Sequence, residues 1–385
     1  MENERQEPIP AGLLRRKTGL LVYLAFLLAL CAGLEGAARA IGARSMNSQL
    51  RMVLFGYGQL ARGDISRFRF VPDAALPYRL RPGFEFTSPD GLQVTRHNDA
   101  GFRADGGFPP KTAGTLRIIC LGGSTTYGVS VIDNAATYPA ALERILNNDP
   151  RPPGWDRVEV FNLGVGGYTS REVLTNLEIH GLPLEPDVVL IQCAVNDVAP
   201  RFYDDFDADY RHFRKPVQSI EPGFLARIAY RSHLVLMAGW KLGAFTPITL
   251  QSRSQYPMPP AARAVENLRK NGTEAFRNNL AEAVDLAQES GARVWLLTQA
   301  HCFSPVFEAP EKDTRLLDKA YRSGLVEHNA VVRGLAADKA VGLADLERTM
   351  PTSLKYFKDP IHMSEEGNLV KARLIAESIR DGLPH

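Results

Sequence analysis

Short runs of apolar and β-branched residues recur along the chain from residue 114 onward, and each ends near Gly, Asn or another polar residue. These runs are 116–122, 158–164, 187–195, 292–300 and 340–346. Continuous apolar runs of this length are typical of strands that are buried on both faces. Helical patterns lie between and after them, at 137–148, 170–181, 273–291, 315–338 and 364–383. The alternation predicts an α/β fold with a parallel sheet covered by helices on both faces. Ligands of such sheets bind at the carboxyl ends of the strands.

The N-terminal pattern is different. Three basic residues, Arg15 to Lys17, precede an uncharged apolar stretch that runs from Thr18 to Leu34 and ends at Glu35. This length is near the lower limit for crossing a bilayer. We therefore predict a transmembrane anchor at 18–38 and a cytoplasmic N-terminus at 1–17. The alternative is a cleaved signal peptide, for which "AARA" at 37–40 resembles a cleavage site, but the apolar run is long for a signal peptide.

A single-pass anchor with this orientation places the rest of the chain outside the cytoplasm, in the periplasm or the extracellular space, attached to the cell inner membrane. Residues 39–113 are rich in Gly, Pro and Arg, and we interpret them as a stalk and a lead-in on the domain surface. The main domain is expected at 114–385.

A long insertion at 200–272 breaks the alternation of strands and helices. It contains an acidic and aromatic part, a strongly apolar part with scattered cations, and a proline-rich loop. We expect an extra helix packed over the sheet, and the alternative is a lid or a membrane-facing surface. Arg227, Arg231 and Lys241 are too closely spaced for a second span.

Composition and cysteine content narrow the class of protein. The 385 residues carry a formal net charge of +2, so no basic surface indicates a nucleic-acid partner. Cys31 lies in the apolar span, and Cys120, Cys193 and Cys302 are expected as buried thiols, although a Cys120–Cys193 bridge stays open. The cysteines lack metal-ligand spacing and there is no H-E-x-x-H motif, so neither a metal nor an organic cofactor is expected.

Candidate catalytic residues follow three of the predicted strands. In "LGGSTTYG", Ser124 comes directly after the first strand, and two glycines allow a tight turn there. The turn suits a nucleophile, but by itself it is more typical of a capped helix start, and a phosphate-binding loop would need a lysine. In "NLGVGGYTS", Gly167 can present its N–H to an oxyanion. In "AVND", Asn196 is a neutral amide donor suited to a developing oxyanion, and Asp197 is expected to brace the loop.

The segment "KDPIHMSEEGN" adds an acid and a histidine shortly before the last predicted helix. Pro360 favours an extended conformation for Asp359, so the segment is a loop, and Ser364 is the expected N-cap of the helix. Asp359 and His362 are three residues apart, which suits a histidine general base oriented by a carboxylate.

The order of Ser, Gly, Asn and Asp-x-x-His resembles the SGNH (GDSL-like) hydrolase superfamily, and "RHNDAGFR" at 96–103 resembles the lead-in of its membrane-anchored bacterial members. The resemblance implies a three-layer α/β/α flavodoxin-like fold with a five-stranded parallel sheet. It also implies a catalytic set of Ser124, His362 and Asp359, with an oxyanion hole formed by Ser124, Gly167 and Asn196. Two residues depart from the family pattern, because Gly123 replaces the usual Asp and Ala194 replaces the usual Gly.

The expected function is that of a serine esterase acting outside the cytoplasm, with a carbohydrate deacetylase as one form. The expected partners are an acylated small molecule or polysaccharide and, through the N-terminal helix, the membrane. Lipid esters are a second substrate option if the segment at 220–250 touches the bilayer. One alternative is an O-acyltransferase that modifies a cell-envelope polysaccharide with the same residues. Another is a catalytically silent carbohydrate-binding protein of the same fold.

Overall fold

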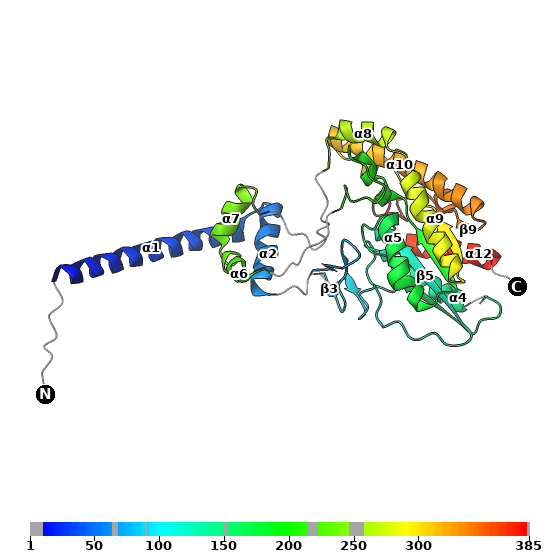
Figure 1. Ribbon diagram of the computed structural model, residues 1–385, viewed down its shortest axis with the longest axis horizontal. Coiled ribbons are helices and arrows are strands. Elements are labelled where there is room, and N and C mark those ends of the chain that lie inside the picture. The colour runs from blue at the N-terminus through cyan, green and yellow to red at the C-terminus, as the bar shows by residue number, and fades with distance from the viewer. Residues whose placement is uncertain are drawn as a thin grey trace. The chain divides into compact units, whose positions relative to one another are not determined.

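The computed structural model describes residues 11–63, 68–88, 91–148, 152–214, 222–245 and 258–382. These residues form two compact units. One unit combines the N-terminal residues up to 65 with residues 219–252, and the other contains residues 66–218 and 253–385. Figure 1 shows the helices and strands of both units. The domain boundaries expected from the sequence, 39–113 and 114–385, stay predictions.

The larger unit is built on a parallel five-stranded sheet with the order β6-β5-β7-β8-β9. Every neighbouring pair of strands is parallel. The α/β fold and the flavodoxin-like strand order expected from the sequence are therefore confirmed. The strands coincide with the five apolar runs: β5 (Thr115–Gly122), β6 (Arg157–Asn162), β7 (Val188–Gln192), β8 (Arg293–Leu297) and β9 (Gly342–Ala344).

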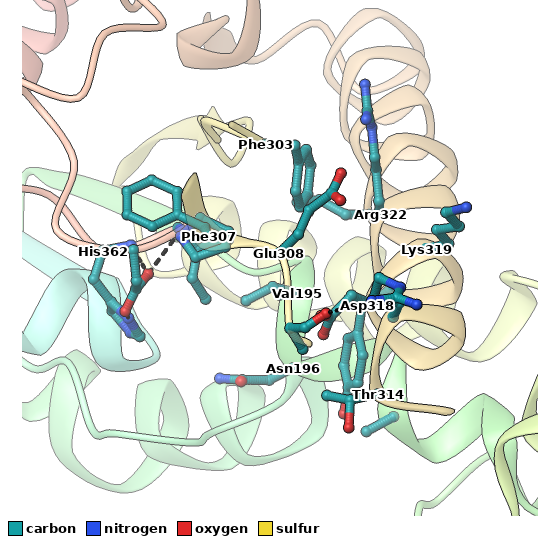
Figure 2. Close-up of a pocket in the computed structure, with 18 of the residues that line it drawn as sticks. Val195, Asn196, Phe303, Phe307, Glu308, Thr314, Asp318, Lys319, Arg322 and His362 are labelled. Atoms are coloured by element: carbon teal, nitrogen blue, oxygen red, sulfur yellow. Dashed lines mark hydrogen bonds and ion pairs between the residues drawn. The ribbon is translucent and has the colours of Figure 1, made fainter. Parts of the chain in front are cut away.

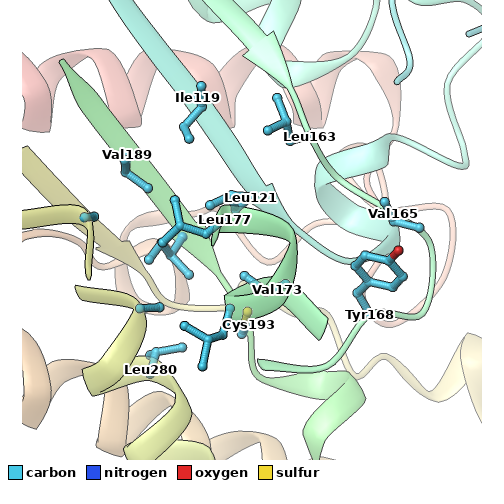
Figure 3. Packing of buried hydrophobic residues seen from close by; sticks show 14 of the residues in the cluster. Ile119, Leu121, Leu163, Val165, Tyr168, Val173, Leu177, Val189, Cys193 and Leu280 are labelled. Atoms are coloured by element: carbon cyan, nitrogen blue, oxygen red, sulfur yellow. The ribbon is translucent and has the colours of Figure 1, made fainter. Parts of the chain in front are cut away.

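Helices cover both faces of the sheet, which explains why the strands are apolar throughout. On one face, α4 (Tyr138–Asn148) and α12 (Glu365–Gly382) pack against each other and against the sheet. On the other face lie α5 (Ser170–Asn176), α9 (Glu274–Glu289) and α10 (Lys312–Asp338), and Figure 3 shows part of the core beneath them. The shorter helical elements are η1 (Leu177–Gly181), η2 (Leu182–Leu184), η3 (Val195–Asp197), η4 (Ala199–Phe202), η5 (Pro305–Phe307) and α11 (Leu346–Thr349).

The lead-in segment contributes to the core of this unit. It forms two small antiparallel pairs, β1 (Phe70–Val71) with β2 (Arg79–Leu80) and β3 (Glu85–Thr87) with β4 (Val94–Arg96). Phe70, Tyr78 and Phe102 are buried in the same apolar cluster as the strand residues Ile119 and Val189. The segment therefore does more than lie on the domain surface, because its aromatic side chains complete the core.

The insertion is divided between the two units. Within the larger unit, α8 (Ala261–Lys270) packs against η4 and α10, with Phe202, Phe213 and Leu268 in a shared apolar cluster. In the smaller unit, α6 (Phe224–Ala229) and α7 (His233–Lys241) pack with the N-terminal helices α1 (Ala11–Arg44) and α2 (Ser48–Arg62). Among the residues that the structure describes, one helical stretch is long and apolar enough to cross a membrane, Gly19–Arg44.

The cysteines are free thiols. Cys120, Cys193 and Cys302 are buried, as expected from the sequence, and Cys31 is exposed. Cys120 packs into the apolar cluster under α4 and α12, whereas Cys193 packs into the cluster under α5 and α9. Because the two thiols lie on opposite faces of the sheet, they do not form the bridge that the sequence left open.

Candidate active site

The first strand of the site, β5, ends in a turn that only glycine fits. A Cβ atom on Gly122 would lie 2.6 Å from the carbonyl oxygen of Gln192 and 2.4 Å from Oγ1 of Thr126. Without that Cβ, the chain passes directly into the four-residue helix α3 (Ser124–Tyr127). The side chain of Ser124 therefore starts at the carboxyl end of the sheet.

Ser124 begins a chain of two short hydrogen bonds. Its Oγ lies 2.7 Å from Nε2 of His362, and Nδ1 of His362 lies 2.6 Å from Oδ2 of Asp359. An ionised carboxylate only accepts hydrogen bonds, so Nδ1 carries the imidazole proton and donates it to Asp359. Nε2 is then the acceptor for the hydroxyl of Ser124. Figure 2 shows His362 at the wall of the cavity described below.

The loop that carries the acid and the histidine is held at several points. Oδ1 of Asp359 accepts hydrogen bonds from the backbone N–H groups of Ile361 (2.9 Å) and His362 (2.8 Å). Ser130 donates to the carbonyl of Met363 at 2.6 Å. Burial raises the pKa of Asp359, but its hydrogen bonds and the nearby imidazole outweigh this effect, and the pKa is lowered. Asp359 is therefore ionised at neutral pH.

A buried ion pair fixes the loop that contains Gly167. The backbone of Gly167 has a φ of +87°, a left-handed conformation that favours glycine. The carbonyl of Gly167 accepts a hydrogen bond from Arg214, which also donates to Oε1 of Glu172 at 3.0 Å. Glu172 in turn accepts hydrogen bonds from the N–H and hydroxyl of Thr169, both at 2.6 Å. The position of the loop thus depends on Arg214, a residue that the sequence interpretation did not single out.

The loop after β7 is tied to the same region. Asn196 donates from Nδ2 to the carbonyl of Tyr168 at 2.8 Å. Asp197 is fully buried and accepts hydrogen bonds from the N–H (2.9 Å) and hydroxyl (2.6 Å) of Ser170. Burial raises the pKa of Asp197 to about 7. Asp197 therefore braces the loop of Asn196 against the start of α5.

The two departures from the family pattern have different surroundings. A Cβ atom on Gly123 would lie 2.5 Å from Nδ2 of Asn196, so the glycine leaves room for that amide. Ala194 has an extended φ of 179° and is buried. Its carbonyl is 2.8 Å from Nδ1 of His328. Val195 and Asn196, but not Ala194, line the adjacent cavity.

A cavity of about 610 Å³ adjoins these residues. Its wall includes Gly167, Asn196, Asp359 and His362, so four of the five candidate residues face one space. Figure 2 shows Lys319 and Arg322 on α10, across the cavity from His362. Aromatic and charged side chains make up much of the remaining wall: Phe213, Phe303, Phe307, Glu308, Arg315, Asp318 and Tyr321.

The part of the wall on α10 could not be read from the sequence. The pattern of residues 315–338 predicts a helix, but nothing in it shows that its first turns face the site. In the structure the guanidinium of Arg322 lies 5.0 Å from the ring centroid of Phe303, which comes from the loop after β8. The two elements thereby form one side of the cavity.

The lead-in segment forms hydrogen bonds with the last residue of α3, Tyr127. Nε2 of His97 lies 2.9 Å from the hydroxyl of Tyr127, and Arg103 donates to the carbonyl of Tyr127 at 3.2 Å. Burial lowers the pKa of His97 to about 3, so this histidine is neutral at physiological pH. The segment "RHNDAGFR" therefore has a structural role, because it holds the C-terminal residue of the helix that begins at Ser124.

A buried lysine lies beside the same turn. Lys371 of α12 is fully buried, and its Nζ donates to Oε1 of Gln192 at 2.6 Å and lies 3.7 Å from the ring centroid of Tyr138. The same Gln192 oxygen accepts a hydrogen bond from Thr125 at 3.2 Å. Burial lowers the pKa of Lys371 to about 7. Among the described residues, no group of three or more His, Cys, Asp or Glu is arranged to hold a metal ion.

Residues 120–370 match the model of the GDSL-like lipase/acylhydrolase family. The match covers more than half of the chain, so the protein belongs to this family, as the sequence resemblance indicated. Its members are lipases and acylhydrolases, which act on acyl esters. No curated protein matches the chain.

Solved structures include similar chains. A lipase/acylhydrolase from Enterococcus faecalis is 16% identical, with a TM-score of 0.40, and the match covers 70% of this chain and 97% of that one. A catalytic mutant of an acetylxylan esterase from Geobacillus stearothermophilus is 15% identical, with a TM-score of 0.40 and coverage of 70% and 95%.

Proposed function

We propose that the protein is a serine esterase that uses Ser124 as nucleophile, His362 as general base and Asp359 to orient the imidazole. The observation that carries this proposal is the pair of hydrogen bonds, 2.7 Å from Ser124 to His362 and 2.6 Å from His362 to Asp359, at the wall of a 610 Å³ cavity. Membership of an acylhydrolase family gives the reaction class.

The reaction proceeds in two halves. Oγ of Ser124 attacks the carbonyl carbon of the ester while Nε2 of His362 accepts the hydroxyl proton. The tetrahedral intermediate collapses, the alcohol leaves with the proton that His362 returns, and the acyl group stays on Ser124. Water then repeats the attack with His362 again as base, which releases the carboxylic acid and restores the hydroxyl of Ser124.

The oxyanion of each tetrahedral intermediate needs hydrogen-bond donors that are already in place. We assign this role to the N–H groups of Ser124 and Gly167 and to the amide of Asn196. Nδ2 of Asn196 gives one hydrogen to the carbonyl of Tyr168, which fixes its direction and leaves its second hydrogen for the substrate. The contacts of Arg214 and Asp197 support this arrangement because they hold the loops of Gly167 and Asn196.

The proposed substrate is an acetylated carbohydrate, so the proposed activity is that of a carbohydrate deacetylase. The aromatic side chains Phe303, Phe307 and Tyr321 line the cavity and supply apolar surface for sugar rings, and the charged groups between them offer hydrogen bonds to hydroxyls. Transfer of the acyl group to a sugar hydroxyl of a cell-envelope polysaccharide, instead of to water, remains the alternative, because both reactions share the acyl-enzyme.

We further propose that α1 anchors the protein in the cell inner membrane as one of the membrane-anchored members of the family. The candidate span Gly19–Arg44, whose uncharged part ends at Leu34, and the basic residues before it support this assignment. The catalytic unit then lies in the periplasm or outside the cell.

The test is hydrolysis of p-nitrophenyl acetate by the detergent-solubilised full-length protein. Ser124→Ala should abolish turnover, whereas Ser353→Ala, which removes an exposed hydroxyl from the same unit, should leave it unchanged. Equal turnover by the wild type and Ser124→Ala would contradict the proposal. Absence of turnover in a folded wild type would favour the carbohydrate-binding alternative.

A second measurement separates hydrolase from transferase. Acetate release and acetylation of a neutral oligosaccharide acceptor are followed in the same reaction by mass spectrometry. An esterase releases acetate at a rate that the acceptor does not change. A transferase forms acetylated oligosaccharide at the expense of acetate, and this product would replace the deacetylase assignment.

A further inference from the structure

The smaller unit exposes more apolar surface on α6 and α7 than a water-soluble helix pair carries. On α6, Phe224 is 77% and Leu225 is 78% exposed, and on α7 the residue after the helix, Leu242, is 84% exposed. Ile228 of α6 is also more than half exposed. Soluble proteins rarely leave such a group of large apolar side chains in water, so the exposed residues indicate a binding surface.

The charges of this segment are of one sign. Between Pro222 and Phe245 the sequence contains Arg227, Arg231 and Lys241 but no Asp or Glu. Tyr230 and Trp240 of the same segment are partly buried and pack against the apolar core of the smaller unit, so the exposed apolar surface consists of aliphatic side chains and Phe224. Basic residues combined with exposed apolar side chains are typical of helices that lie in the membrane interface and contact anionic headgroups.

The position of α7 is fixed to one point of α1. The carboxylate of Glu35 accepts hydrogen bonds from the hydroxyl of Ser232 at 2.7 Å and from the backbone N–H groups of His233 (3.0 Å) and Leu234 (3.1 Å). A carboxylate at a helix N-terminus also interacts favourably with the helix dipole. One turn further along α1, Arg39 donates to the carbonyl of Arg231 at 2.9 Å. The N-terminus of α7 is thus bound at the level of Glu35.

Glu35 directly follows the C-terminal end of the uncharged apolar stretch of α1. The uncharged stretch from Thr18 to Leu34 has 17 residues. As an α-helix it is roughly 25 Å long, slightly less than the hydrocarbon thickness of about 30 Å. Glu35 therefore lies near the outer boundary of the hydrocarbon, and the helix that it caps begins at the same depth.

The other side of α7 is already covered. Leu236 is fully buried against Leu50, Val53 and Leu54 of α2, which together form the apolar core of the smaller unit. Because α2 covers this face, the exposed residues of α6 and α7 are the ones that remain for an external partner.

We propose that α6 and α7 form a second membrane contact, a pair of interfacial helices that lie at the headgroup level beside the end of α1. Phe224, Leu225 and Leu242 insert among the upper acyl chains. Arg227, Arg231 and Lys241 contact anionic lipid headgroups. The inference rests on the proposed anchoring by α1. It gives this part of the insertion the role of a membrane-binding surface.

The experiment measures the depth of single fluorophores in the full-length protein, reconstituted in vesicles that contain phosphatidylglycerol. In a Cys31→Ser background the remaining native cysteines are buried, so an added exposed cysteine takes up an NBD label selectively. Leu225→Cys reports on α6, Leu24→Cys on the span, and Leu354→Cys, on an exposed position of the catalytic unit, serves as the water-exposed control.

At position 225 we expect blue-shifted emission and several-fold stronger quenching by a lipid with a nitroxide near the headgroup than at position 354. Position 24 should be quenched best by a nitroxide deep in the acyl chain. Quenching at 24 but not at 225 would overturn the inference and leave the anchor intact. Blue-shifted emission at 225 without quenching would assign the surface to a protein partner and also overturn it. No quenching at 24 would refute the anchor and the inference together. Esterase turnover of the same samples is an independent readout of the proposed function.

Discussion

Replacement of Gly123 by alanine tests the oxyanion assignment with a change of one methyl group. The added Cβ would lie 2.5 Å from Nδ2 of Asn196 and 3.4 Å from the carbonyl oxygen of Tyr168. Ordinary contacts between such atoms are about 3.5 Å or longer, so the amide of Asn196 must move by roughly 1 Å. This shift disturbs the 2.8 Å hydrogen bond that directs the amide.

The cost to stability and the cost to turnover should differ widely. One hydrogen bond on a half-buried side chain contributes about 0.5–1.5 kcal/mol, so Gly123→Ala should remain folded with a modestly lower melting temperature. Displacement of a catalytic group by about 1 Å, or loss of one oxyanion donor, lowers turnover by on the order of 10²-fold or more. We expect that loss in kcat for p-nitrophenyl acetate, with a small change in KM.

The double variant shows whether the methyl group acts through Asn196. Asn196→Ala alone should lower kcat by about 10²- to 10³-fold. If Gly123→Ala acts only by displacing this amide, the double variant should be no slower than Asn196→Ala. Wild-type turnover in Gly123→Ala, or a double variant whose loss is the product of the two single losses, would refute the reasoning.

Three further outcomes follow from other contacts. Asp359→Asn should lower kcat by roughly 10³- to 10⁴-fold without unfolding the protein, because the amide no longer holds the imidazole in the required tautomer; near-normal turnover would contradict that role. Burial lowers the pKa of His328 to about 3, so between pH 6.5 and 3 the unfolded chain binds a proton that the folded protein does not, and stability is lost as the pH falls. Urea denaturation should therefore show that the wild type loses about 2 kcal/mol more than His328→Gln between pH 7 and pH 5, and equal losses would exclude this cause. Gly164→Ala places a Cβ 2.4 Å from the backbone nitrogen of Tyr127 and should cost about 2 kcal/mol or more in a thermal melt, whereas Gly166→Ala, whose nearest contact is 3.8 Å, should cost less than about 1 kcal/mol.

The strands could be predicted from the sequence because two covered faces make them continuously apolar. The five runs correspond to β5 to β9, and the strand order agrees with the resemblance. The strands of the lead-in segment were harder to predict, since they are two or three residues long and carry no periodic pattern. Its aromatic residues, such as Tyr78, are recognisable as core only once the fold brings them against Val189.

The candidate site was accessible from the sequence where each residue directly follows a strand or lies on a constrained loop. Gly167 and Asn196 line the same cavity as His362, which is hydrogen-bonded to Ser124, because parallel strands end at the same edge of the sheet. Arg214 lies in the insertion, far along the chain from its partner Glu172, and no local pattern predicts that ion pair. The placement of residues from α10 in the cavity wall likewise depends on tertiary packing, which sequence periodicity does not contain.

The packing of the smaller unit likewise could not be predicted from sequence periodicity. A segment of the insertion packs with helices that are nearly 200 residues away in the sequence, through the contacts of Glu35 with the start of α7. From the sequence alone, a packed helix, a lid and a membrane-facing surface all stayed open for this segment. Only the exposure of individual side chains distinguishes the face that packs on α2 from the face that we assign to the membrane.

The central claim is that the hydroxyl of Ser124 is an activated nucleophile. The most direct measurement is reaction of the full-length protein with a fluorophosphonate, followed by proteolysis and mass spectrometry of the labelled peptide. The account predicts a single adduct on Ser124 that is absent from Ser124→Ala and strongly reduced in His362→Ala. An unlabelled but folded wild-type protein, or an adduct on another serine that persists in Ser124→Ala, would contradict it.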